Sequence, residues 1–330
     1  MGFSTFKVIE PGPFTTIRKL LEQTSADKNT FALNILDRFA LKIGNLLLKN
    51  PLDEAGIEMV GEGAEIEVKR ETAIAVTGGS FDVKLNGKPV PQWHTLCVSE
   101  GDILSVGISK FGWRCYICVA GGIREVRESR LKAVSHREKK SESLRSSLKK
   151  REVLISGTSA VPLNQLIGRK VRDTILPRLQ GERELRIILM PPYEYLKDES
   201  KEVFLNSSYR LSSDSSFVNY QFEGPRLLFK DEIQRDVVFD RSYPQNGEYT
   251  SGVIYVMADG EMIYAGSDFV SAKGYKDRIE IARIILPDVD RVAQLRPEDH
   301  IKFKVITQDD ARSIFNYTIG LISETNILSM

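Results

Sequence analysis

The sequence is poor in the side chains that build disulfide frameworks and metal sites. Its 330 residues include three cysteines and three histidines. Three cysteines do not make a disulfide framework in a chain of this length. The histidines, at positions 94, 136 and 300, are too scattered for the usual spacing of zinc ligands. We therefore expect neither a disulfide scaffold nor a bound metal.

Long apolar runs are also missing. No stretch of eighteen apolar residues is present, so the sequence predicts no membrane-spanning helix. Residues 1–10 lack the basic and apolar regions of a secretory signal, and we expect a cytoplasmic protein. The hydrophobic content of 42% and the charged content of 28% are typical of a globular fold, and the length predicts two domains.

Charge of one sign gathers in a single segment, although the net charge of the chain is only +1. Residues 124–152 contain eleven Lys or Arg and five Glu. Such a segment could contact an anionic partner, or it could be a solvated helix or loop. It lacks the interleaved aromatic residues of a nucleic-acid interface, so we do not expect nucleic acid as a partner.

Residues 1–123 have the pattern of a β-rich domain with one helix. Residues 31–48 carry apolar side chains at helical spacing, and Asn50-Pro51 ends that segment. Residues 57–68 alternate apolar and acidic side chains, which is typical of a half-buried strand. Asn86-Gly87 between apolar runs predicts a hairpin turn.

The remainder of the chain divides into a linker and a second β-rich domain. Residues 124–182 predict a basic linker that is partly helical or irregular, and residues 183–330 predict the second domain. Its expected strands are residues 185–189, 253–257, 261–264, 279–286 and 300–306. The sequence thus predicts a mainly β fold with some α (α+β), made of two barrel-like units.

Residues 114–123 form an apolar run that stops on two glycines. A run of this kind predicts a strand that is buried on both faces. Cys115 and Cys118 lie three residues apart, so on a strand they point to opposite faces. We interpret them as buried structural cysteines rather than as a redox or metal pair, since cysteine is among the most buried residue types.

Several blocks in order resemble the KipA-type family, which includes the C subunit of 5-oxoprolinase, allophanate hydrolase subunit 2 and KipI antagonists. The blocks are residues 73–79, 85–93, 98–106, 114–123 and 291–303. The resemblance implies two cyclophilin-like β-barrel units and a complex with a KipI-type partner, such as a protein like the B subunit of 5-oxoprolinase. It also implies ATP-dependent opening of 5-oxoproline, and related carboxyltransferase domains use biotin.

The chain departs from the family pattern at groups that would hold negative charge. Arg18-Lys-Leu-Leu-Glu22 replaces a Gln-Asp-x-Gly-Arg run, and Phe217 and Gln221 replace two arginines. In residues 268–276 the family's amide and Thr-Thr pair are replaced. Removing one oxyanion donor typically costs about a hundred- to a thousandfold in rate. The chain therefore either performs different chemistry or is a non-catalytic relative.

The candidate site residues are those where the family match and the chemistry coincide. Glu58 could act as a general base or be a surface carboxylate, and Asp268 could be catalytic or stabilise a turn. Arg114 could bind substrate, or it could pair with Asp102 or Asp37. The glycine amides could hold a carboxylate or a phosphate. The predicted substrate-binding residues are Asp37, Thr77, Gly78, Gly79, Arg114, Gly121, Gly122, Gly274 and Tyr275.

Two hypotheses about function follow from the resemblance. The first is a divergent subunit of a 5-oxoprolinase/allophanate hydrolase-like complex, a hydrolase of C–N bonds that opens a lactam or amide with a KipI-type partner. We would then expect ATP as a cofactor of the whole complex. Biotin is a weaker expectation than ATP. The second is a non-catalytic regulatory or interaction protein that keeps the fold and uses residues 124–152 as its partner contact.

Overall fold

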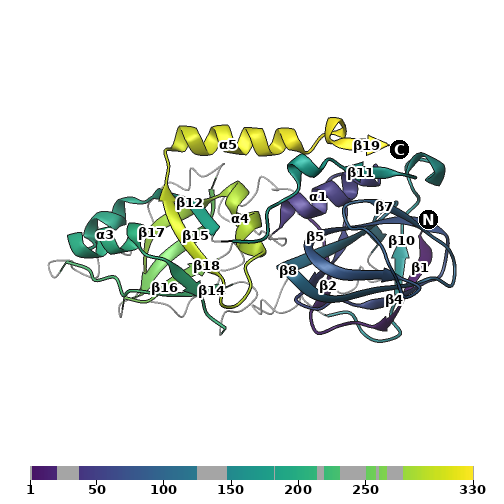
Figure 1. Cartoon of the computed structure of the whole chain (residues 1–330), viewed down its shortest axis with the longest axis horizontal. Helices are drawn as coiled ribbons and strands as arrows, with labels where there is room; N and C mark the ends of the chain where they lie inside the picture. Colours follow the sequence, from purple (N-terminus) through teal and green to yellow (C-terminus); the bar gives the residue numbers. More distant parts are fainter. Residues whose placement is uncertain are drawn as a thin grey trace, which may run out of the picture. The chain divides into compact units, whose positions relative to one another are not determined.

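The computed structural model describes residues 2–20, 37–124, 147–181, 183–213, 219–230, 250–257, 260–265 and 278–329. The chain forms two compact units, both drawn in Figure 1. Among the described residues, those up to residue 180 and those from residue 321 on form the first unit, and those between 181 and 320 form the second. No helix in the described ranges is both long and apolar enough to cross a membrane.

A ten-stranded sheet forms the body of the first unit. Its strands run in the order β2-β3-β8-β4-β1-β10-β9, and β5 pairs with β6, β7 and β8. Their bounds are β1 Phe3–Glu10, β2 Thr15–Arg18, β3 Gly56–Val60, β4 Glu65–Val68, β5 Thr72–Leu85, β6 Lys88–Pro89, β7 Thr95–Val98, β8 Ile103–Val119, β9 Ile123–Arg124 and β10 Val153–Ser156. The unit also contains α1 Arg38–Leu47, β11 Arg169–Val171, β19 Ile327–Ser329 and the 3₁₀ turns η1 Leu163–Gln165, η2 Asp173–Ile175 and η5 Glu324–Asn326.

The two longest strands, β5 and β8, pair along most of their length. The pairing register shifts at several points between Gly78 and Val83 of β5. Such bulges bend a strand and increase its twist. Gly78 has φ +103°, and a Cβ atom there would lie 2.5 Å from the Arg114 carbonyl oxygen. Glycine is therefore required where β5 bends against β8.

The prediction of a strand buried on both faces is confirmed in the second half of β8. Residues 115–119 are fully buried. Cys115 belongs to the apolar core of the unit, whereas Cys118 lies next to Gly44 of α1 on the other face. Both cysteines are free thiols, so they are buried structural residues as predicted.

The predicted hairpin at Asn86-Gly87 is also confirmed. Leu85 on β5 pairs with Lys88 on β6 across this turn. Asn86 and Gly87 have φ values of 51° and 75°, as a type I′ turn requires at both central residues.

Helix α1 covers the outer face of the sheet. Its buried residues include Leu41, Ile43 and Gly44, and at Gly44 a Cβ would lie 2.6 Å from the Cys118 Sγ. The sequence predicted a half-buried strand over residues 57–68, but all five residues of β3 are buried because this face is covered too. The strand also ends at Gly61, which has φ +73°, before β4 begins.

The first unit includes residues that the sequence assigned elsewhere. Part of the predicted linker forms β10, which pairs with β1 and β9, and its Leu154 is buried in the core. Residues 327–329, assigned to the second domain, form β19, which pairs with β11. These pairings join residues far apart in sequence, which local patterns do not report.

The second unit is a closed barrel with the strand order β12-β17-β15-β16-β14-β13-β18. The bounds are β12 Arg183–Leu189, β13 Tyr209–Leu211, β14 Asn219–Glu223, β15 Thr250–Met257, β16 Met262–Ala265, β17 Arg278–Ile285 and β18 His300–Val305. All five predicted strands are present. The helical elements, which the sequence did not predict, are η3 Pro191–Tyr195, α3 Asp198–Asn206, α4 Leu286–Ala293 and α5 Gln308–Leu321.

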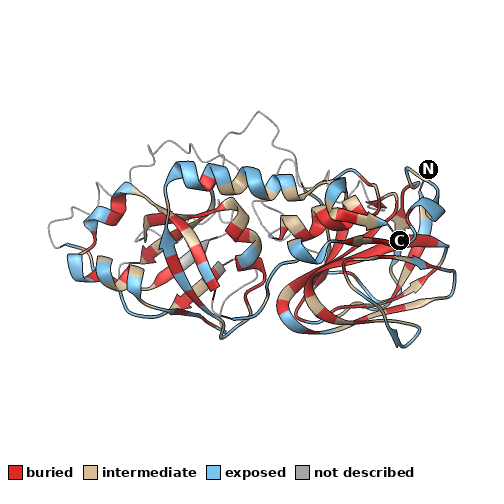
Figure 2. Ribbon diagram, turned by 45° about the horizontal axis from the view of Figure 1, so that its top comes forward, coloured by how far each residue is buried: buried red, intermediate tan, exposed pale blue. Residues whose placement is uncertain are grey.

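Aromatic side chains fill part of the barrel core. The ring centroids of Phe204 and Phe303 are 5.1 Å apart, and those of Tyr209 and Phe303 are 5.6 Å apart. In Figure 2 buried positions alternate with intermediate or exposed ones along several strands, as in β12 and β18. Burial of such rings contributes much of the stability of a core. The strands and helices of the two units together give a mainly β fold with some α.

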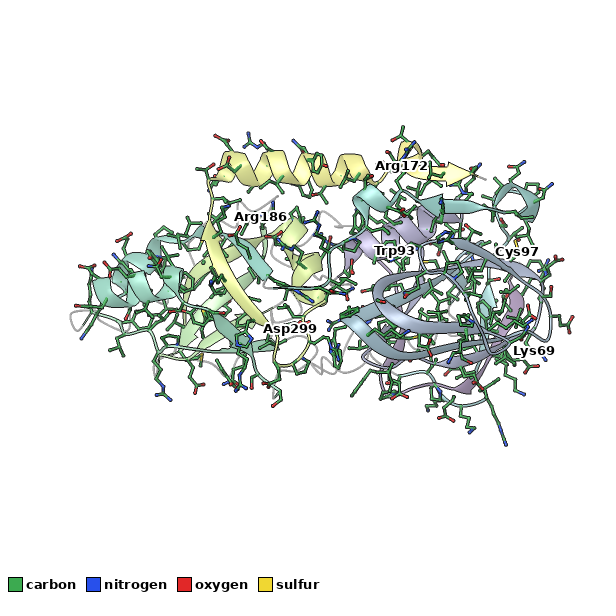
Figure 3. The ribbon with its side chains drawn as sticks, in the orientation of Figure 1. Lys69, Trp93, Cys97, Arg172, Arg186 and Asp299 are labelled. Carbon is green, nitrogen blue, oxygen red and sulfur yellow. The ribbon has the colours of Figure 1, made fainter. Side chains whose placement is uncertain are left out.

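A buried ion pair anchors α4 to β12. Asp288 in the first turn of α4 is fully buried, and its Oδ2 accepts hydrogen bonds from the backbone N–H and the Nε–H of Arg186, at 2.7 and 2.9 Å. Its Oδ1 accepts another from the Arg186 Nη2. Arg186 is labelled in Figure 3. A carboxylate with this many donors is satisfied despite its burial.

We expect Asp288→Asn to lower the free energy of unfolding by about 2–3 kcal/mol, because a buried, charge-assisted pair loses its anion. Asp309→Asn is the matched control, since Asp309 is an exposed acidic residue in the first turn of α5. Urea denaturation of the two variants measures the difference. Equal stability of the variants would contradict the anchoring role of Asp288.

Candidate functional site

A buried polar cluster lies on the outer face of the first unit's sheet, and Glu58 of β3 is its centre. The Tyr116 hydroxyl donates a hydrogen bond to Glu58 Oε2 at 2.7 Å. The Arg18 Nε lies 3.3 Å from Glu58 Oε1. Glu58 is only 6% exposed, so its alternative interpretation as a surface carboxylate is wrong.

Strand register brings these side chains together. Glu58 is directly opposite Tyr116 on β8 and directly opposite Thr16 on β2. Residues directly opposite one another in an antiparallel pair share a face of the sheet. Arg18 and Arg114 each lie two residues from one of these positions, so they belong to the same face.

Helix α1 adds a second carboxylate to this face. Asp37 caps the helix by accepting a hydrogen bond from the Ala40 N–H at 2.9 Å, and it is 4% exposed. The positive end of the helix dipole favours a carboxylate at this position. Arg114 of β8 is 2% exposed.

The charged groups of the cluster influence the pKa of the Tyr116 hydroxyl. Burial raises the pKa of Tyr116 well above its ordinary value, and the negative charges of Glu58 and Asp37 raise it further. The positive charge of Arg114 opposes this shift. The phenol therefore keeps its proton and serves Glu58 as a hydrogen-bond donor.

The cluster thus combines two carboxylates, two guanidinium groups and a phenol in a site with little access to water: Asp37, Glu58, Arg18, Arg114 and Tyr116. Removing charged groups from water is costly even when they are paired. Groups arranged in this way suit acid–base chemistry and the binding of a polar substrate. This cluster is the candidate functional site.

Three predicted site residues, Asp37, Glu58 and Arg114, therefore come together. Thr77 on β5 is directly opposite Tyr116, and its hydroxyl donates to the Ala40 carbonyl at 2.8 Å. Next to it, the Gly79 carbonyl accepts a hydrogen bond from the Gln92 side chain. Thr77 and Gly79 hold α1 and the loop after β6 in place beside the cluster.

The predicted glycine pair Gly121-Gly122 lies in the turn that follows β8. The Gly121 amide donates to Asn50 Oδ1 at 2.9 Å, and the Gly122 amide donates to the Val119 carbonyl. A Cβ at Gly122 would lie 2.0 Å from the Glu54 Cγ. These contacts explain why glycine is needed here, and the binding of substrate by this pair stays a prediction.

The remaining predicted residues fall outside the described part of the chain. They are Asp268, Gly274 and Tyr275, together with most of the basic segment 124–152. Gln221, which replaces a family arginine, lies on β14 and donates to Glu261 Oε2 at 3.2 Å.

Two members of the cluster were not predicted from the sequence. Tyr116 lies inside an apolar run, where an aromatic residue is most simply interpreted as core. Arg18 was noted only as a departure from the family pattern. The hydroxyl of Tyr116 could have indicated a polar neighbour, since a buried tyrosine hydroxyl usually requires a hydrogen-bond partner. Finding the partner required knowing that β3 pairs with β8.

Trp93 lies at the edge of the core. It is 9% exposed, and its ring centroid is 6.4 Å from that of Phe39 on α1. Figure 3 labels it in the first unit.

The donor set of the cluster limits the ligands that it can hold. Within the described ranges no group of three or more His, Cys, Asp or Glu is placed to hold a metal ion. The cluster balances the carboxylates of Glu58 and Asp37 with two guanidinium groups, so it suits a small polar molecule that carries both donors and acceptors.

We expect Tyr116→Phe to destabilise the protein in a pH-dependent way. At pH 8 the variant should lose about 1–2 kcal/mol, because Glu58 loses a buried hydrogen bond. The raised pKa of Tyr116 means that above about pH 10 the unfolded chain releases a proton that the folded chain keeps. The stability of the parent protein therefore falls with rising pH in that range, and phenylalanine has no such loss.

The difference between parent and variant should accordingly shrink above about pH 10, by up to about 1.4 kcal/mol per pH unit. Urea denaturation at pH 8 and pH 10.5 measures it. Tyr317→Phe is the control, since Tyr317 is 70% exposed. A constant difference across this pH range would contradict the buried, protonated state of Tyr116.

Relatives of two kinds match the chain. The C subunit of 5-oxoprolinase from Haemophilus influenzae is 25% identical over 281 residues, which is 84% of each chain. The Escherichia coli protein of the same name is 26% identical over 312 residues, or 92% of each chain. Urea amidolyase of Lachancea kluyveri is 24% identical over 324 residues, but this chain spans only 17% of that protein.

Solved structures show the same fold. The crystal structure of the K. lactis urea amidolyase superposes with a TM-score of 0.78 at 22% identity, covering 98% of this chain and 21% of that one. The Kluyveromyces lactis urea carboxylase gives the same TM-score at 21% identity and is covered over 30% of its length. At these identities the likeness concerns the fold alone.

The expected resemblance to the C subunit of 5-oxoprolinase is thus confirmed at the level of the family. The model of the carboxyltransferase domain, subdomains A and B, matches residues 35–305, and the chain belongs to that family.

Proposed function

We propose that the chain is a divergent subunit of a 5-oxoprolinase/allophanate hydrolase-like complex and contributes Glu58 to the opening of a C–N bond in a lactam or amide. The observation that carries the proposal is the buried carboxylate of Glu58, held between the Tyr116 hydroxyl and the Arg18 guanidinium. A carboxylate fixed on one side by a donor keeps lone pairs on its other oxygen for a proton.

In this proposal Glu58 is the general base. It accepts a proton from the water whose oxygen bonds to the carbonyl carbon, and it returns that proton to the departing nitrogen as the C–N bond breaks. Arg114 and Arg18 would stabilise the negative charge that develops on the carbonyl oxygen. Tyr116 is a positioning residue, because it acts through Glu58.

The relatives support a role within a larger assembly. The two 5-oxoprolinase relatives are matched over 84% and 92% of their own length, and both are named as subunits, which implies at least one other chain. We propose a KipI-type protein, or one like the B subunit of 5-oxoprolinase, as that partner. We assign ATP to the complex as a whole.

A regulatory protein without catalysis is the second candidate. The position of Gln221 favours it, because this replacement of a family arginine donates to Glu261 within the same barrel. A side chain engaged in this way supports the fold of the barrel and puts no cation at this position to hold an anionic intermediate. In this case residues 124–152 would contact the partner.

The first proposal predicts that the purified complex either opens 5-oxoproline in an ATP-dependent reaction or hydrolyses a C–N bond of allophanate. Glu58→Gln should lower kcat by about a hundredfold or more, since a general base contributes that much. Glu62→Gln is the matched control, because Glu62 is exposed in the same Glu-rich segment. Release of the opened product, measured with co-purified partner, is the assay.

A complex that forms but turns over neither compound would favour the regulatory protein. Equal activity of the Glu58→Gln and Glu62→Gln variants would remove Glu58 from the catalytic role. Thermal denaturation of both variants shows whether any loss reflects unfolding.

A further inference from the structure

A cavity of about 410 Å³ opens at one end of the first unit, away from the Glu58 cluster. Its walls come from the start of β1, the turn between β4 and β5, and the loop that follows β10. Every residue that lines it is described and belongs to the first unit. Ligand pockets of proteins typically have volumes of about 300–1,000 Å³, so the cavity can hold a small molecule.

One side of the cavity presents a cation. The Arg70 guanidinium lies over the Phe3 ring, 3.7 Å from its centroid, and within the described ranges it makes no hydrogen bond or ion pair. Stacking occupies the face of the guanidinium and leaves its N–H groups at the edge. Such an edge binds a carboxylate through two hydrogen bonds.

Further donors lie along the same cavity. Thr72 is only 6% exposed, and its hydroxyl has no hydrogen-bond partner among the residues that the structure describes. The backbone N–H groups of residues 158–160 are likewise unpaired in that part of the chain. Thr158 and Ala160 are exposed, so these donors are open to the oxygen of a ligand that enters the cavity.

The floor of the cavity, in contrast, presents acceptors. The Thr5 hydroxyl donates to the Phe3 carbonyl at 2.8 Å, so the 2.6 Å contact between the Thr5 and Ser156 hydroxyls uses the Ser156 proton. Both residues are buried, and both protons are engaged. The hydroxyl oxygens of Thr5 and Ser156 can therefore still accept hydrogen bonds from a ligand, but they cannot donate them. Glu71, which also lines the cavity, adds a carboxylate that forms no ion pair with any described residue.

We propose that this cavity binds a small zwitterion, an α-amino acid with an apolar side chain. The carboxylate would pair with Arg70, Thr72 and the amides of the loop, and the ammonium would donate to Glu71 and the hydroxyl oxygens of the floor. Apolar residues of the wall, Ala120, Val161, Pro162 and Leu163, would contact the side chain. A simple anion fits less well, because Glu71 and the acceptor floor would repel it. The site is independent of Glu58.

Calorimetric titration of the full chain with L-norleucine, hexanoate, pentylamine and inorganic phosphate tests the proposal. Hexanoate is norleucine without its ammonium, and pentylamine is norleucine without its carboxylate. Each should bind at least about tenfold more weakly than norleucine, since each loses one set of charged contacts. Phosphate should bind no better than hexanoate.

Variants locate the site. Arg70→Met should weaken norleucine binding by about tenfold or more, and the isosteric Thr72→Val should weaken it by several-fold. Lys69→Met is the matched control and should leave binding unchanged, because Lys69 pairs with Glu67 and does not line the cavity. Figure 3 labels Lys69 on the first unit.

Absence of saturable binding up to about 10 mM norleucine would overturn the proposal. So would hexanoate or phosphate binding as tightly as norleucine, or equal affinities of the Thr72→Val and Lys69→Met variants and the parent. Unfolding midpoints of the variants separate a lost site from a lost fold, and Thr72→Val decides the matter if Arg70→Met does not fold.

Discussion

The packing of α1 on the outer face of the first sheet is the constraint on which the candidate site depends. Gly44 permits this approach, because any side chain there would collide with the Cys118 Sγ and crowd the Thr77 hydroxyl. Thr77 in turn donates to the Ala40 carbonyl of the helix. With the helix in this position, β3 and the end of β8 are covered on both faces, and Glu58 is removed from water.

Burial then determines the chemistry of the cluster. A carboxylate on an open sheet face would be solvated and would have little reason to pair with a phenol. Under α1, Glu58 instead takes its hydrogen bond from Tyr116, whose raised pKa keeps the proton available. Asp37 arrives with the helix, since it is the cap that starts α1. The helix therefore both covers the site and supplies one of its charges.

Local patterns in the sequence predicted local features well. Asn86-Gly87 requires a type I′ turn whatever surrounds it, and the five strands of the second barrel follow from alternation and β-branched content. The Glu58–Tyr116 pair could not be found in this way, because it depends on which strands are neighbours. The same limit explains β10 and β19, whose partners lie far away in sequence. Helix α4 was missed because Leu286 continues the apolar pattern of β17.

Trp93 illustrates how the fold stabilises a costly conformation beside the candidate site. Its φ of 61° lies in the left-handed region, which a bulky residue adopts at a cost of about 1–2 kcal/mol. The backbone N–H of Trp93 donates a hydrogen bond to the Val76 carbonyl, and the Trp93 carbonyl accepts one from the backbone N–H of Val171. Its ring meets Phe39 of α1. These contacts connect β5, β11 and the helix through one residue, so the strain is offset by interactions that also fix α1 over Glu58. A rigid support of this kind is what a buried acid–base group requires, since its hydrogen bonds tolerate little displacement.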